Sequence, residues 1–227
     1  TNYRINTAIA QETILEGSTG PQPISDFYTL NINSPMKHKS TQKGVSLELN
    51  VDLGNNLTLT YLPSRRSSDV ELAIDSDWLS ASVRASLFVE KQTQVSNELR
   101  FLKEGDNYNL VFGGYLYSEE AEATAAINIF DHPIDPDYVA PFDARSQTDS
   151  SAAFINSQYF LSDNLSMSLG SRLSHEEKHF YSSVSDETKS WSEFTPRLGL
   201  EYSINDDVFL YSSISEGFKS GGFNLVD

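Results

Sequence analysis

The sequence predicts an all-β protein: an antiparallel meander of hairpins with one apolar and one polar face, as in a transmembrane β-barrel. Three observations support this prediction. Apolar and polar residues alternate with a period of two in several stretches, a pattern that only a strand places on opposite faces. Short turn motifs separate these stretches in pairs. No run of about 18 apolar residues is present that would predict a membrane-spanning helix.

The stretch Phe194–Ser215 shows the pattern most clearly. One face of its first half carries Phe194, Pro196, Leu198, Leu200, Tyr202 and Ile204, and the other carries Thr195, Arg197, Gly199, Glu201 and Ser203. Asn205-Asp206-Asp207 then provides a turn, because short polar side chains bond their own backbone. A second strand is expected over Val208–Ser215. Both of its faces carry apolar residues, so the sequence leaves open which of them is the apolar face.

Three more hairpins precede this one. The first pairs Val45–Leu53 with Leu57–Tyr61, the second pairs Gln94–Leu102 with Tyr108–Tyr117, and the third pairs Ala152–Leu161 with Leu165–Tyr181. Together the hairpins give about eight strands. We expect their turns near Asn55, Gly105, Asp163 and Asp206, all on the same side of one antiparallel sheet. Residues 1–43 are less regular, with a strand expected within 1–15 and a loop over 17–40.

Between the hairpins the sequence predicts long polar loops near residues 78, 135 and 186. One covers Glu119–Asp149 and another covers Ser182–Ser190, while the run Val83–Val89 fits either a strand or a helix. Short turns on one side and long loops on the other are typical of outer-membrane barrels, whose short turns face the periplasm. This rule places Asp206 on the inner side and Asp135 on the outer side.

Composition excludes several classes of protein. The 227 residues carry a formal net charge of -16, which argues against nucleic acid as a partner, because such proteins need basic patches to neutralise phosphates. There is no cysteine, so disulfide frameworks and thiolate metal sites are excluded. No signal peptide is visible at the N-terminus, so we expect either that one was removed or that the chain is an internal piece of a longer protein.

No catalytic, cofactor or metal site is predicted. His175 and His179 lie four residues apart, which on a strand separates them by about 13 Å, too far to share a metal. The cluster Asp131–Asp137 lacks the spacing of a calcium loop and is expected to be a solvated external loop. The adjacent pair Glu119 and Glu120 would point to opposite faces of a strand, so it does not form an acid–base couple.

Several motifs resemble a known family. The phrases T-P-R-L-G-L-E-Y-S at 195–203, D-V-F-L-Y-S-S at 207–213 and E-G-F-K-S-G-G-F-N at 216–224 resemble the late barrel of TonB-dependent outer-membrane receptors, and N-E-L-R-F at 97–101 followed by G-G-Y-L-Y at 113–117 adds to the likeness. The resemblance implies a barrel of about 22 strands closed by an N-terminal plug. On this reading residues 1–227 are an internal part of the barrel, about eight or more strands of a larger whole, without the plug and the C-terminal strands.

The resemblance also implies a function. Such receptors lie in the outer membrane of Gram-negative bacteria, contact its lipid, and import a large, scarce nutrient using the TonB complex, which acts through the plug. The expected ligand is a ferric siderophore or other iron complex, with cobalamin or a glycan as further members of the class. No cofactor and no enzymatic activity are implied. The alternative is a soluble extracellular β-sandwich that binds carbohydrate, in which the apolar faces would pack on each other.

Two groups of residues follow as candidates for the site. The first group would contact substrate from the external loops, and it comprises Trp78, Asp135, Asp137, Trp191 and Phe218. The second group would face the lumen from the polar sides of the strands, and it comprises Glu48, Arg172, Arg197 and Glu201. Leu47, Leu49, Leu169, Leu198 and Leu200 would face outward, toward lipid.

Overall fold

The computed structural model describes residues 36–76, 84–129 and 139–223, with the side chains of 127–129 and 139–141 left aside. All regular elements in this part of the chain are β-strands. They are β1 (Lys37–Ser46), β2 (Leu49–Asp52), β3 (Leu57–Asp75), β4 (Arg84–Glu104), β5 (Tyr108–Ile129), β6 (Val139–Ser162), β7 (Leu165–Ser182), β8 (Asp186–Asn205) and β9 (Val208–Ser215). The all-β prediction is confirmed, and Val83–Val89, which fitted a strand or a helix, lies in β4 from Arg84 onward.

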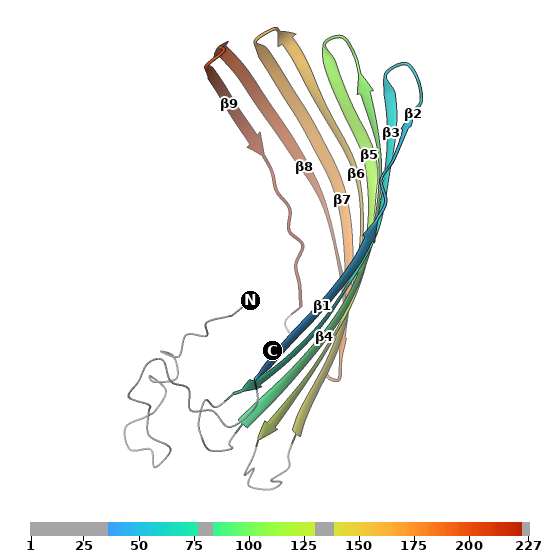
Figure 1. Cartoon of the computed structure of the whole chain (residues 1–227), viewed down its shortest axis with the longest axis vertical. Coiled ribbons are helices and arrows are strands. Elements are labelled where there is room, and N and C mark those ends of the chain that lie inside the picture. Colours follow the sequence, from blue (N-terminus) through green and yellow to red (C-terminus); the bar gives the residue numbers. More distant parts are fainter. Residues whose placement is uncertain (1–35, 77–83, 130–138, 224–227) are drawn as a thin grey trace, which may run out of the picture. The chain divides into compact units, whose positions relative to one another are not determined.

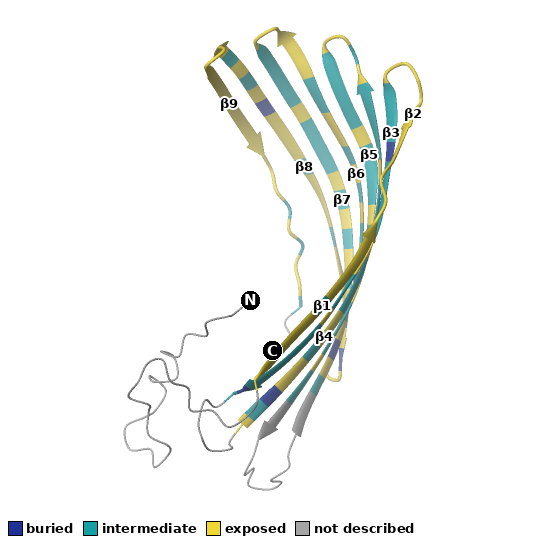
Figure 2. Ribbon diagram, in the orientation of Figure 1, coloured by how far each residue is buried: buried dark blue, intermediate teal, exposed yellow. Residues whose placement is uncertain are grey.

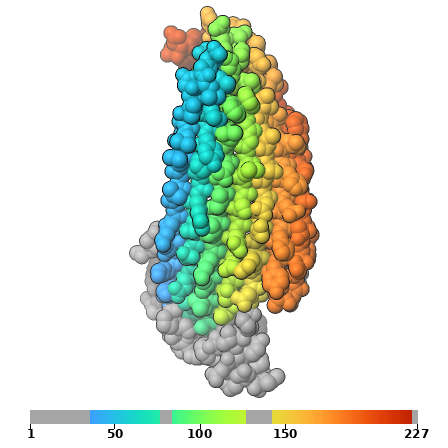
Figure 3. Space-filling view, turned by 90° about the vertical axis from the view of Figure 1, so that its right-hand side faces the viewer, coloured from blue at the N-terminus to red at the C-terminus, as the bar shows by residue number. Residues whose placement is uncertain are grey.

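The strands follow one another in chain order within a single sheet (Figure 1). The order is β1-β3-β4-β5-β6-β7-β8-β9, and the short β2 pairs with β3. Figure 3 shows these strands side by side, from the N-terminal ones in blue to the C-terminal ones in orange. The pairings β2–β3, β6–β7, β7–β8 and β8–β9 are antiparallel. Within the described residues β1 and β9 end this order, so the sheet is an open meander.

Contacts divide the chain into two units. The described part of the first unit comprises 36–41, 69–76, 84–90, 123–129 and 139–143, and the described part of the second comprises 42–68, 91–122 and 144–223. Within the first unit, Lys37 forms an ion pair with Glu71 at 2.6 Å. All four predicted turns and every motif that carries the family resemblance lie in the second unit, which the following paragraphs describe.

The four predicted turns lie together at one end of the second unit, as predicted. Backbone hydrogen bonds join each turn to the next hairpin: Glu104 N donates to Asn56 O at 3.0 Å, Phe160 N to Asn107 O at 2.8 Å, and Ser203 N to Asn164 O at 2.9 Å. Figure 1 shows these turns at the upper ends of the strands. In the first turn Asn55 and Asn56 have φ values of 54° and 57°, the left-handed conformation that Asn tolerates better than most residues.

The predicted bounds of the long loops are wrong where the structure describes them, whereas residues 78 and 135, the centres of two of these loops, lie outside the described residues. β3 continues to Asp75, β5 continues to Ile129, and only residues 183–185 separate β7 from β8, where a loop over Ser182–Ser190 was expected. The physical reason is clearest over residues 182–190, where Val184 is the single apolar residue and no apolar alternation marks the start of β8. A strand surrounded by water on both sides needs no apolar alternation, so its sequence cannot be told from that of a loop.

Strand register assigns every described residue of β7 and β8 to one of two faces. Leu169 lies opposite Leu198, which in turn lies opposite Ile214 of β9, so these three share one face. This apolar face also holds Leu165, Met167, Leu173, Phe194, Pro196, Leu200, Tyr202, Ile155, Tyr159 and Leu210. The opposite, polar face holds Ser166, Ser168, Arg172, Glu176, Lys178, Trp191, Thr195, Arg197, Glu201 and Tyr211.

The apolar face extends across the sheet. The ring of Tyr159 is tilted by 37° against that of Tyr108 of β5, with centroids 6.2 Å apart, and Phe112 of β5 stacks on Phe101 of β4 at 5.1 Å. The hydroxyl of Tyr61 on β3 donates to Asn97 of β4 at 2.7 Å. Leu49 of β2 lies opposite Tyr61. Leu49, Leu169, Leu198 and Leu200 therefore lie on one face, as predicted, whereas for Leu47, which lies between β1 and β2, the side stays a prediction.

This apolar face is open. Leu169, Leu198 and Leu200 are 43%, 40% and 46% exposed, and Figure 2 shows β8 and β9 mostly in the colour of exposed residues. In the described part of the chain the buried hydrophobic residues are Ala144 and Phe180. Apolar residues in a β-sandwich would be buried against a second sheet. The exposed apolar face is thus at odds with the sandwich alternative.

Among the described glycines, Gly113 is the one whose added Cβ would clash with the backbone of a neighbouring strand. A Cβ at Gly113 would lie 2.3 Å from the carbonyl oxygen of Leu99 and 2.9 Å from the ring of Phe154. A Cβ at the next residue, Gly114, would make only an ordinary contact at 3.7 Å. The sequence motif Gly113-Gly114 therefore contains one glycine that packing requires and one that it does not.

Candidate functional site

The residues predicted to contact substrate are partly outside the described chain. Trp78, Asp135 and Asp137 lie outside the described residues. Trp191 lies within β8, on the polar face, so its predicted place in an external loop is wrong. Phe218 lies in the segment that follows β9. Whether Trp191 and Phe218 contact substrate stays a prediction.

The four residues predicted to face the lumen are found on the polar side of the sheet. Arg172, Arg197 and Glu201 lie opposite Thr195, Gly170 and Ser166 of the neighbouring strand, all on the polar face. Glu48 lies between β1 and β2 and accepts a hydrogen bond from Asn50, which in turn accepts one from Thr60. Their common side agrees with the predicted pattern. That this side meets a lumen stays a prediction.

Arg172 and Glu201 belong to separate polar groups. Glu201 Oε2 accepts hydrogen bonds from Ser166 Oγ at 3.0 Å and from Gln158 Nε2 at 3.3 Å. Arg172 Nε donates to Ser174 Oγ at 3.0 Å, and its guanidinium carbon lies 5.5 Å from the ring centroid of Tyr115. A cation held over an aromatic face in this way is attracted by the ring quadrupole.

A polar cluster that the sequence did not reveal is centred on Glu119. Its carboxylate accepts hydrogen bonds from Gln92 Nε2 at 2.8 Å, from Gln94 Nε2 at 2.7 Å and from the hydroxyl of Tyr117. Glu120, the next residue, is 3.9 Å from Arg145, which also bonds Glu122. Glu119 and Glu120 have separate partners, because neighbouring residues of a strand point to opposite faces. The sequence signal for this cluster was the spacing of its residues. Gln92 and Gln94 lie two apart on one strand, as do Tyr117 and Glu119 on the next, so each pair has its side chains on one face.

A hollow of about 420 Å³ lies beside this cluster. It is lined by Gln42, Lys43, Gly44, Arg66, Ser67, Ser68, Gln92 and Gln94. Arg66 contributes the guanidinium group and the two glutamines contribute amides that are already bonded to Glu119. Lys43 and Arg66 are the cations among the lining residues, and cationic N–H donors suit a ligand with oxygen acceptors.

Lys178 is the centre of a second cluster, on β7 and β8. Its Nζ forms an ion pair with Glu176 at 3.1 Å and lies 6.0 Å from the ring centroid of Trp191. It also donates to Ser220 Oγ at 2.8 Å and to the carbonyl oxygen of Gly221 at 3.0 Å. The segment after β9 thus lies against the polar face of the sheet.

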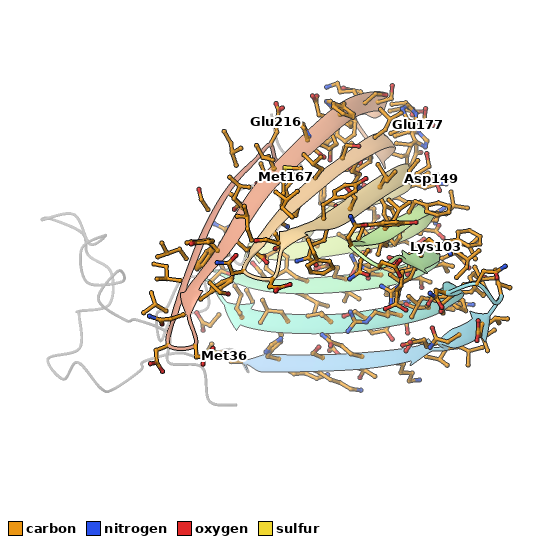
Figure 4. The ribbon with its side chains drawn as sticks, turned by 90° about the horizontal axis from the view of Figure 1, so that it is seen from above. Met36, Lys103, Asp149, Met167, Glu177 and Glu216 are labelled. Carbon is orange, nitrogen blue, oxygen red and sulfur yellow. The ribbon has the colours of Figure 1, made fainter. Side chains whose placement is uncertain are left out.

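The side of β6 and β7 that is apolar near the turns becomes polar farther along the strands. Asp149 lies opposite Glu177, and both side chains are on the same side of the ribbon in Figure 4. His175 Nδ1 lies 2.8 Å from Ser192 Oγ and His179 Nε2 lies 2.7 Å from Asp186 Oδ1, so the two imidazoles have different partners. Over residues 36–76, 84–129 and 139–223 no group of three His, Asp or Glu side chains is placed to hold a metal ion.

Comparison with known proteins now gives the family. The model of the family "TonB dependent receptor-like, beta-barrel" matches residues 1–227. The chain belongs to this family. Among the curated proteins no sequence matches the chain. The part of the chain that the structure describes contains no helix with the length and hydropathy needed to cross a membrane.

Solved structures of TonB-dependent receptors share the fold. The ferric yersiniabactin uptake receptor FyuA from Yersinia pestis superposes with a TM-score of 0.72 at 17% identity, over 86% of this chain and 31% of that one. The ferric citrate transporter FecA superposes with a TM-score of 0.67 at 16% identity, over 78% of this chain and 27% of that one. The copper transporter OprC superposes with a TM-score of 0.66 at 13% identity, over 79% of this chain and 30% of that one. The chain therefore spans about a third or less of the length of these receptors.

Proposed function

We propose that the chain forms a section of the barrel wall of an outer-membrane receptor that imports a large, scarce nutrient, with a ferric siderophore or other iron complex as cargo. The receptor binds and moves its cargo without making or breaking a covalent bond. Its proposed partners are the lipid of the outer membrane of a Gram-negative bacterium, the cargo, and the TonB complex, which would act through a plug segment.

The observation that carries this proposal is the distribution of apolar residues along the strands. On β7 the apolar face runs from Leu165 to Leu173, and on β8 from Tyr202 to Phe194, in both cases starting at the short turns. Each run covers about nine residues, which matches the ~9–11 residues that a tilted strand needs to cross a bilayer. The strands then continue for roughly another eight or nine residues that are mostly polar on both faces, with Phe180, Tyr181 and Trp191 as the aromatic exceptions. This arrangement supports a wall that crosses lipid and projects beyond it.

The polar face supports a binding role for the lumen side. It carries cations next to aromatic rings, in Arg172 with Tyr115 and Lys178 with Trp191, together with the amide and carboxylate groups around Glu119. Cations and rings suit a bulky ligand that is anionic or contains oxygen donors. The neighbours whose names state a ferric cargo, FyuA and FecA, favour an iron complex, whereas OprC is named for copper.

The experiment is an uptake assay with the full-length gene product. Cells that carry the gene, cells from which it is deleted, and cells that lack TonB would be given ⁵⁵Fe bound to catecholate, hydroxamate or citrate carriers, and in parallel ⁶⁴Cu. We expect saturable ⁵⁵Fe uptake with at least one carrier that needs both the gene and TonB. Uptake of copper alone would overturn the iron assignment but leave the transport role. Unchanged uptake of all probes after deletion would overturn the transport role.

A further inference from the structure

The chain leaves the sheet edge after β9. The ladder between β8 and β9 ends with Arg197 opposite Ser215, followed by one further bond from Glu216 N to Pro196 O at 3.0 Å. β8 itself continues to Asp186. The segment Glu216–Phe223, here called the strap, does not pair with that remaining length of β8. It lies on the polar face of β7 and β8 instead.

The first anchor of the strap is at Ser220 and Gly221. The hydroxyl of Ser220 donates to Glu176 and accepts from Lys178, and the carbonyl of Gly221 accepts from Lys178 at 3.0 Å. The Cα of Gly221 rests on Trp191 so closely that a Cβ there would lie 2.7 Å from a ring carbon. Only glycine fits this contact without moving the indole ring.

The second anchor is Phe223. Its ring stacks on Phe180 with centroids 5.4 Å apart and an interplanar angle of 20°. Lys189 Nζ lies 5.0 Å from the centroid of Phe223. Phe180 is only 5% exposed, whereas the polar-face residues that precede it on β7 are half-buried. The strap therefore covers a large apolar ring that the strands alone leave toward solvent.

The strap also engages two cations that face each other. Lys178 and Lys189 are directly opposite on β7 and β8, an arrangement that destabilises a sheet through like-charge repulsion. Each has an acid beside it on its own strand, Glu176 at 3.1 Å and Glu187 at 3.1 Å. The hydrogen bond from Lys189 lowers the pKa of Glu187 from its ordinary value. The strap adds an acceptor pair to Lys178 and an aromatic ring to Lys189, so it moderates this repulsion.

The strap is held at these two anchors, and its backbone at Gly217 and Gly222 has free space around it. A Cβ at Gly217 or at Gly222 would meet nothing within 4 Å. Glu216, Gly217, Lys219, Gly221 and Gly222 are exposed. Glycine has the widest range of accessible backbone conformations, so rotation at Gly217 and Gly222 can release the anchors without unfolding β9.

We propose that the strap is a releasable cover: docked, it closes the surface formed by Trp191, Lys178 and Phe180, and released, it opens that surface to solvent and to ligand. In the docked strap, Ser220 and Gly221 accept hydrogen bonds from Lys178, and Phe223 stacks on Phe180. A molecule that offers both an oxygen acceptor and a flat ring competes with the strap for the same contacts. This inference rests on the contacts of the strap and not on transport, so it can fail while the proposed function stands.

The test is hydroxyl-radical footprinting of the full-length protein in detergent, read residue by residue by mass spectrometry. Gly221→Val places a branched side chain against Trp191, and Gly222→Val is the matched control, because its side chain meets open space. We expect oxidation of Phe180 to rise about tenfold in Gly221→Val, since Phe180 is 5% exposed under the strap whereas an open ring on the same polar face, Tyr211, is 78% exposed. Gly222→Val should match the wild type, and Tyr211, which is 78% exposed, should react equally in all three proteins.

A second variant keeps the test decisive if Gly221→Val does not fold. Cysteines at Phe180 and Phe223, in a protein with no cysteine in this chain, are expected to be linked by a bifunctional thiol reagent and to keep Trp191 protected. Equal oxidation of Phe180 in wild type, Gly221→Val and Gly222→Val would overturn the proposal. So would failure of the two cysteines to link, because the strap would then not dock where the contacts place it.

Discussion

Leu198 offers the most direct test of which face meets lipid. It is the central residue of the apolar run on β8, four residues from Phe194 and four from Tyr202, with Leu169 and Ile214 opposite it. At about 3.3 Å per residue it lies roughly 13 Å along the strand from each end of the run. Its side chain is 40% exposed and would contact acyl chains.

Substituting Leu198→Arg puts a charge at the middle of the apolar band. A charged residue on the lipid face of a barrel costs about 2–4 kcal/mol at the midplane and about 0–1 kcal/mol near the interfaces. We therefore expect Leu198→Arg to lower the free energy of unfolding by about 3 kcal/mol, and Tyr202→Arg, at the end of the band, to lower it by about 1 kcal/mol or less. A cost in unfolding free energy that falls from Leu198 to Tyr202 indicates contact with a bilayer, because packing against other protein would not depend on depth in this way.

The assay is urea unfolding of the full-length protein in phospholipid vesicles. The matched control is Ser213→Arg, because Ser213 lies one residue from Ile214 on β9 and points to the polar face, opposite Gly199. Its cost should be within about 0.5 kcal/mol of zero, as for most surface substitutions. If Ser213→Arg costs as much as Leu198→Arg, or if Leu198→Arg and Tyr202→Arg cost the same, the assignment of the lipid face is wrong.

Three further predictions concern packing and the polar face. Gly113→Ala should destabilise the protein by about 1–3 kcal/mol in the same unfolding assay, because its Cβ would meet the Leu99 carbonyl oxygen at 2.3 Å, whereas Gly114→Ala should change stability by less than about 0.5 kcal/mol. Glu201→Ala removes the acceptor of two side-chain hydrogen bonds and should cost about 1 kcal/mol, measured as a shift in the urea midpoint, with Glu201→Gln restoring part of it. Arg172→Ala should cost about 1 kcal/mol through loss of the contact with the Tyr115 ring, and a Tyr115→Leu background should remove most of that cost in a double-mutant cycle.

The sequence by itself determined the hairpins near the short turns. Alternation with a period of two and the turn residues Asn55, Gly105, Asp163 and Asp206 are local properties, so they can be read without knowing the partner strand. The same local pattern identified the side of Arg172 and Glu201 and the opposite side of the leucines. The family motifs at 195–203 and 216–224 depend on sequence alone, and the family assignment agrees with them.

The tertiary structure decided which face each residue of β9 occupies, how far the strands extend, and which distant residues are in contact. For Val208–Ser215, pairing with β8 places Leu210 and Ile214 on the apolar face and Tyr211 on the polar face, which the sequence left open because both sets are apolar. The polar continuation of β7 and β8 over residues 174–182 and 186–193 is strand and not loop, because its backbone pairs with the neighbouring strand along its whole length. The contact of Glu119 with Gln92 joins residues 27 positions apart, and the pairing of whole strands brings them together. The contact of Gly221 with Trp191 joins residues 30 positions apart, and it forms because the strap leaves the sheet edge and lies on the polar face of β8.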